Sequence, residues 1–77
     1  MDELLLGLIN TVRGNKGQDR IVALRPDLRL RQDLGFDSFD LAELTVRIEE
    51  ACQMDIFADG LVHTVGEVLA KLERKAA

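Results

Sequence analysis

Residues 34–39 read Leu34-Gly35-Phe36-Asp37-Ser38-Phe39 and lead directly into an acidic segment with helical periodicity. Gly35 allows a tight backbone turn, and the Asp37 carboxylate can cap a helix by accepting N–H groups of its first turn. Ser38 then takes the first helical position, where the helix dipole favours an anion by roughly 0.3 to 1 kcal/mol at an exposed site. This stretch therefore predicts a loop-to-helix junction at which the Ser38 hydroxyl can bear an anionic group.

Three segments have the spacing of apolar residues that is typical of amphipathic helices. The first is predicted from about Asp2 to Arg13, with Gly14 as its exit, and the second from about Ser38 to Cys52. The third begins at Thr64, where Thr64-Val65-Gly66-Glu67 matches the capping-box pattern. The inward-facing residues are predicted to be Leu5, Leu8, Ile9 and Val12; Leu41, Leu44 and Ile48, with Ala51 or Cys52; and Val65, Val68, Leu69 and Leu72. No strand-length alternation interrupts them, so the fold class is predicted to be all-α.

The segments between these helices differ in length. Asp55 to His63 leaves room for at most a turn or two of helix, with His63 in a loop. Gly14 to Asp37 is long for a loop in so small a domain, and a loop of that length often has a function. Its apolar residues can hold it across the helices: Ile21, Val22, Leu24, Leu28, Leu30 and Leu34. Part of Asp19 to Leu24 could instead form a short helix.

Length and composition limit the function. A chain of 77 residues is predicted to form a single domain over residues 1–77, with one small core and little room for a deep active site. We therefore expect no enzyme, no catalytic residue and no metal site. The net charge of -4 disfavours nucleic acid and anionic membrane as partners and favours a protein with a basic docking surface.

Cysteine usage and hydropathy bear on location. Cys52 is the single cysteine and cannot form an internal disulfide, so the fold does not depend on an oxidising compartment. Cys52 lies on the apolar stripe of the second predicted helix, and we interpret it as a core residue. No stretch approaches transmembrane length, and the first residues lack the basic region of a secretion signal. A cytoplasmic location is expected.

The sequence resembles the acyl carrier proteins over nearly the whole chain. The resemblance rests on Asp33-Leu34-Gly35-Phe36-Asp37-Ser38, followed by Glu43-Leu44 and Ile48-Glu49-Glu50. In that family a serine bears 4'-phosphopantetheine, which is derived from coenzyme A and attached by a phosphopantetheinyl transferase. The resemblance assigns this role to Ser38, with Asp37 as the helix cap beside it. It also implies a small four-helix bundle with a long first loop and a short third helix.

The same resemblance implies transport rather than catalysis. The arm ends in a thiol that holds an acyl or aminoacyl group as a thioester, and tethering raises the concentration of that group at each partner active site. The expected partners are the transferase, an acyl- or aminoacyl-loading ligase, and downstream acyltransferases or synthases of fatty-acid, polyketide or related biosynthesis. The chain is expected to be a monomer. Docking is predicted on the second helix, by Asp37, Phe39, Asp40, Glu43, Val46, Glu49 and Glu50.

Several alternatives stay open. The chain could be a helical interaction module that never receives the group, with Ser38 an ordinary first helical residue and the acidic face ordinary solvated surface. It could also be a small nucleic-acid-binding domain that uses Arg25, Arg29 and Arg31. Within the carrier interpretation the cargo could be a fatty acyl, a short acyl or an aminoacyl group, although a short segment from Ile56 to Thr64 that includes Phe57 favours small cargo.

Overall fold

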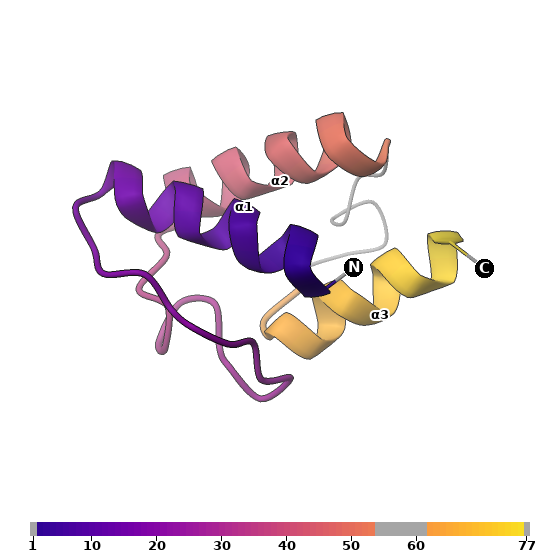
Figure 1. Cartoon of the computed structure of the whole chain (residues 1–77), viewed down its shortest axis with the longest axis horizontal. Helices are drawn as coiled ribbons and strands as arrows, with labels where there is room; N and C mark the ends of the chain where they lie inside the picture. Colours follow the sequence, from indigo (N-terminus) through magenta and orange to yellow (C-terminus); the bar gives the residue numbers. More distant parts are fainter. Residues whose placement is uncertain (1, 54–61, 77) are drawn as a thin grey trace.

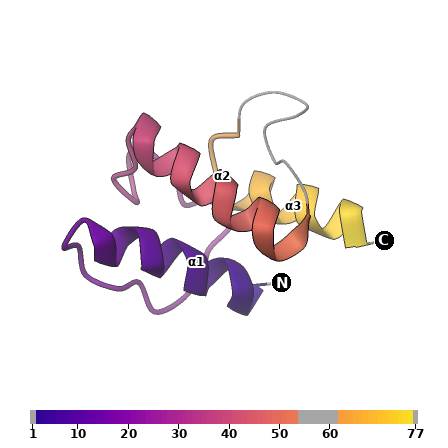
Figure 2. The same ribbon diagram turned by 90° about the horizontal axis from the view of Figure 1, so that it is seen from above.

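The computed structural model describes residues 2–53 and 62–76, and this part of the chain contains three helices (Figure 1). They are α1 (Asp2–Asn15), α2 (Ser38–Cys52) and α3 (Val65–Ala76). α1 and α2 pack side by side and run in opposite directions, and α3 lies across the other side of the core (Figures 1 and 2). The all-α prediction is confirmed, but a bundle of four helices is not. The short third helix was expected within residues 55–63, most of which lie outside the described residues.

The core is built from the helix faces that the periodicity predicts. Its helical members are Leu5, Ile9, Val12, Leu41, Leu44, Ile48, Val65, Val68, Leu69 and Leu72. The loop before α2 adds Leu30, Leu34 and Phe36, each at most 2% exposed. Cys52 is half-buried and packs against this core, whereas Ala51 is exposed, which decides between the two residues predicted for the last turn of α2. The loop is thus part of the core.

The end of α1 differs from the prediction. The exit was expected at Gly14, but the helix continues to Asn15, and the residue with positive φ is Gly17, at 76°. The Gly17 N–H donates to Gly14 O at 3.0 Å and the Gln18 N–H donates to Arg13 O at 2.9 Å. These two bonds form a Schellman motif with Gly17 at its left-handed position. The prediction therefore chose the wrong one of two nearby glycines.

The long loop is held against α1 by Asn10. The Asn10 side chain donates to Ile21 O at 3.0 Å and accepts from the Ile21 N–H at 2.8 Å. Both backbone groups that Ile21 would use in a helix are thereby occupied, and the alternative helix over Asp19 to Leu24 is absent from the structure. Val22 is 93% exposed, so the prediction that it helps to hold the loop is wrong.

The same loop is also fixed to the start of α3. The Leu30 N–H donates to His63 O at 2.8 Å, and the Val65 N–H donates to Leu28 O at 2.9 Å. Thr64 caps α3 as predicted, because its hydroxyl accepts from the Glu67 N–H at 3.2 Å. The Glu67 carboxylate in turn accepts from the His63 N–H at 3.1 Å. The loop therefore crosses from α1 to α3 before it returns to the start of α2 (Figure 1).

Candidate functional site

Ser38 is exposed and is the first residue of α2, as predicted. Asp37 has an extended backbone and is the N-cap, with its carboxylate accepting from the Asp40 N–H at 2.9 Å. The Asp40 carboxylate reciprocally accepts from the Asp37 N–H at 2.9 Å. The predicted cap is confirmed, and the two aspartates together form a capping box that satisfies two N–H groups around Ser38.

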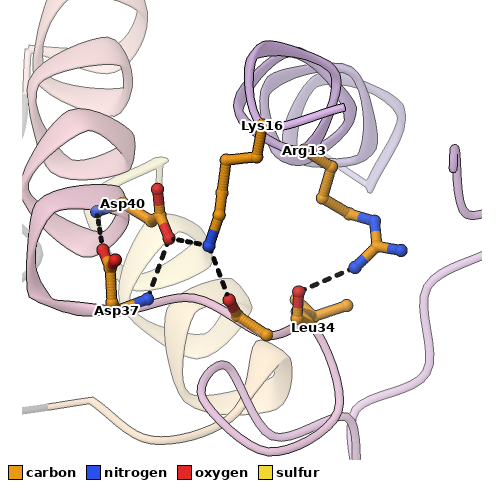
Figure 3. A network of polar contacts seen from close by, with 6 residues as sticks. Arg13, Lys16, Leu34, Asp37 and Asp40 are labelled. Atoms are coloured by element: carbon orange, nitrogen blue, oxygen red, sulfur yellow. Dashed lines mark hydrogen bonds and ion pairs between the residues drawn. The ribbon is translucent and has the colours of Figure 1, made fainter. Parts of the chain in front are cut away.

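The turn before Ser38 is fixed from both sides. Gly35 has φ of 72°, a left-handed conformation that suits the tight turn predicted here, and it lies between the buried side chains of Leu34 and Phe36. From the end of α1, Arg13 donates to Leu34 O at 2.7 Å and Lys16 donates to Gly35 O at 2.9 Å (Figure 3). The position of the hydroxyl-bearing residue is therefore set by core packing and by two cations, Arg13 in the last turn of α1 and Lys16 directly after it.

Asp40 is not the exposed docking residue that the sequence suggested. Asp40 is only 6% exposed, and its carboxylate forms an ion pair with Lys16 (Figure 3). Burial opposes ionisation of Asp40, but hydrogen bonds from Lys16 and Asp37 outweigh it and lower the pKa of the carboxyl below its usual value. The Asp40 carboxylate, which the sequence predicts to face partners, is therefore engaged within the chain.

Glu43 is also engaged within the chain. It is half-buried, and its carboxylate accepts from Arg47 at 2.9 Å and from the Asn15 side chain at 3.0 Å. The pairing of Arg47 with the residue four positions earlier is the geometry in which helical ion pairs form. Glu43 therefore contributes little free negative charge to the surface, contrary to the expectation.

The other predicted docking residues are exposed. Phe39 and Val46 are 87% and 51% exposed, large fractions for apolar side chains. They are seven residues apart, so they lie on the same side of α2, and Glu50 follows four residues later on that side. Glu49 and Glu50 are exposed. We call the four residues Phe39, Val46, Glu49 and Glu50 the docking stripe.

Sequence reasoning missed one contact of the candidate site. The Arg31 guanidinium donates from Nη2 to Ser38 Oγ at 3.4 Å. The sequence suggests Arg31 only as a nucleic-acid contact. Nothing in the sequence places it beside Ser38, because the turn between the two residues sets their distance.

The described residues also bear on the expectations about metal, membrane and cargo. Within residues 2–53 and 62–76, no group of three or more His, Cys, Asp and Glu side chains is arranged to hold a metal ion. None of the described helices is long and apolar enough to cross a membrane. Phe57, on which the expectation of small cargo depends, lies outside the described residues. Leu30 and Ile48, at 1% and 0% exposed, are part of the packed core.

The geometry fits a covalently attached phosphate group. The hydroxyl is exposed, it is placed on a well-held first turn, and a guanidinium lies beside it. None of the solved structures matches this chain. The family described as the phosphopantetheine attachment site matches residues 4–72, which include the turn, α2 and Ser38. The chain therefore belongs to the phosphopantetheine attachment site family, whose members bear covalent 4'-phosphopantetheine and act as carriers rather than as enzymes.

Proposed function

We propose that this chain is an acyl carrier protein that bears 4'-phosphopantetheine on Ser38. It would hold acyl or aminoacyl groups as thioesters and deliver them between enzymes of fatty-acid, polyketide or related biosynthesis. The observation that supports this most directly is the exposed Ser38 hydroxyl at the first position of a capped helix, within the region that the family match covers. Ser38 is also the only serine in the sequence.

The chain's own residues would present the arm rather than perform chemistry. When bound, the prosthetic group supplies the terminal thiol on which cargo is held as a thioester. The capping box of Asp37 and Asp40 holds the first turn of α2, and Arg13 and Lys16 hold the preceding turn against α1. The attachment point would therefore stay in place while the arm reaches the active sites of successive partners.

Partner docking would use the docking stripe. Phe39 and Val46 offer apolar surface beside Ser38 and along α2, and Glu49 and Glu50 offer exposed negative charge. Exposed ion pairs contribute about 0 to 1 kcal/mol each, which suits partners that must release the carrier after each step. The partners in this proposal are a phosphopantetheinyl transferase, a loading ligase, and acyltransferases or synthases, all in the cytoplasm.

Intact-protein mass spectrometry tests the attachment site. After incubation with coenzyme A and a broad-specificity transferase, the wild-type protein should gain one phosphopantetheine group, and Ser38→Ala should gain none. Thr45→Ala is the matched control, because Thr45 is another hydroxyl residue of α2 whose side chain donates to Leu41 O at 2.8 Å. A group added to Ser38→Ala would contradict the assignment. A wild-type protein that stays unmodified would favour an interaction module without the arm.

A further inference from the structure

Arg31 contacts the Ser38 hydroxyl, whereas several other cations near the turn pair with carboxylates. Three arginines of the loop and of α2 pair with carboxylates: Arg25 with Asp27 at 3.4 Å, Arg29 with Asp33 at 3.2 Å, and Arg47 with Glu43 at 2.9 Å. Lys16 pairs with Asp40. Arg31 is exposed, and in the part of the chain that the structure describes it pairs with no carboxylate and donates to Ser38 Oγ at 3.4 Å.

The nearby carboxylates that could compete for Arg31 already have donors. Asp33 accepts from Arg29 Nε and Nη2, both at 3.2 Å, and from the Arg29 N–H at 2.7 Å. These hydrogen bonds lower the pKa of Asp33, which keeps it ionised and paired. The Asp37 carboxylate accepts from the Asp40 N–H in the helix cap. Arg31 is therefore left available for another anion.

The backbone of Arg31 belongs to the same well-held turn as Ser38. The Gly35 N–H donates to Arg31 O at 3.1 Å, and the Phe36 N–H donates to Leu30 O at 3.0 Å. Leu30 is 1% exposed and anchors the turn in the core. The base of the Arg31 side chain is thus fixed relative to Ser38, so the contact depends mainly on the rotamers of one exposed side chain.

We propose that Arg31 binds the phosphate of the pantetheine arm and so orients the first part of the arm at Ser38. This inference rests on the proposed function, because it requires the arm on Ser38. A guanidinium that donates to the serine oxygen is within reach of the phosphate that this oxygen bears after modification. The anionic phosphate oxygens are stronger acceptors than a neutral hydroxyl, and the planar guanidinium can donate two hydrogen bonds to them.

This pairing has a consequence for partner choice. The arm adds one negative charge at the start of α2, and Arg31 would compensate it within the chain. A partner cation opposite the phosphate would then gain little, because Arg31 already balances the phosphate charge. The pair is exposed, so its effect on any one equilibrium should be at most about five-fold.

Nuclear magnetic resonance of the loaded protein tests the proposal directly. Wild type, Arg31→Gln, Arg31→Lys and Arg25→Gln would each be converted to the holo form and checked by mass spectrometry. Arg25→Gln is the matched control, because it removes an equal charge from the same loop at an exposed residue that pairs with Asp27. The readouts are the 31P chemical shift of the phosphodiester and the side-chain Nε–H resonance of Arg31 in apo and holo protein.

We expect the Arg31 Nε–H resonance to shift between apo and holo wild type. The 31P shift should change in Arg31→Gln, stay at the wild-type value in Arg25→Gln, and be partly restored in Arg31→Lys. Equal 31P shifts in wild type and Arg31→Gln, with the arm present on Ser38, would overturn this inference alone. Equal changes in Arg31→Gln and Arg25→Gln would also overturn it, because they would show a general charge effect. Absence of the arm would overturn the proposed function and this inference together.

Discussion

Removal of the Asp40 carboxylate should destabilise the fold, although the sequence suggested a surface residue. The carboxylate accepts from the Asp37 N–H at 2.9 Å and pairs with Lys16, and the residue is 6% exposed. The Asp40→Ala variant would lose both interactions but would keep the bond from its own N–H to the Asp37 side chain. The start of α2 and its connection to α1 should therefore weaken together.

The expected cost follows from these two interactions. Loss of a helix-capping bond typically costs about 1 kcal/mol. A hydrogen bond to a charged group is worth about 1.5 to 3 kcal/mol, and the 29% exposure of the Lys16 side chain lets water recover part of it. We expect Asp40→Ala to lower the free energy of unfolding by about 2 to 3 kcal/mol. A domain of 77 residues has a total of about 4 to 12 kcal/mol, so this is a large fraction.

Urea unfolding followed by far-ultraviolet circular dichroism measures this effect, since the chain has no tryptophan or tyrosine. Asp40→Asn keeps an acceptor without the charge and should show about half of the loss. Glu49→Ala is the control, an exposed acid of the same helix, and should stay within about 0.5 kcal/mol of wild type. A double-mutant cycle with Lys16→Met should give a coupling of about 1 kcal/mol. Equal stability of Asp40→Ala and Glu49→Ala would refute the reasoning.

Three further outcomes are expected. Burial opposes ionisation of Asp40, but the bonds from Lys16 lower its pKa overall. The contribution of Asp40 to the free energy of unfolding is therefore fully present above about pH 4, and it is lost as pH falls through the lowered pKa of the folded state. Asp40→Asn should therefore make the thermal unfolding midpoint depend less on pH in this acid range. Gly17→Ala should destabilise the protein by about 1 kcal/mol, because Gly17 has a positive φ. Gly14→Ala, within α1, should instead stabilise the protein by about 0.5 to 1 kcal/mol. A thermal unfolding experiment that ranks the two variants in the opposite order would contradict the assigned end of α1. Phe39→Ala should leave the thermal midpoint nearly unchanged but slow transferase modification of the chain, and a normal rate would exclude Phe39 from docking.

Features that depend on neighbouring residues could be predicted from the sequence. The bounds of α2 and the cap by Asp37 follow from a few adjacent residues, and both are confirmed. The end of α1 depends on which of two glycines adopts positive φ, and local sequence does not distinguish them. The contacts of Asp40 with Lys16 and of Arg31 with Ser38 were missed because Lys16 is 24 residues from Asp40 and the turn decides what lies beside Ser38. Pairings of this kind are set by tertiary structure.

The same pairings change how the acidic composition of α2 relates to partner choice. Of the acids between residues 37 and 50, Asp37 caps α2 and Asp40 and Glu43 pair with cations, and Glu49 and Glu50 are the acids that the proposed docking uses. They lie at the far end of the helix from Ser38, about 16 Å along its axis from Phe39. If docking uses this stripe as proposed, a partner would need an apolar socket close to its active-site entrance and basic residues roughly 16 Å away. A partner with its cations grouped at the entrance would gain less, because Asp40 and Glu43 already pair with Lys16 and Arg47.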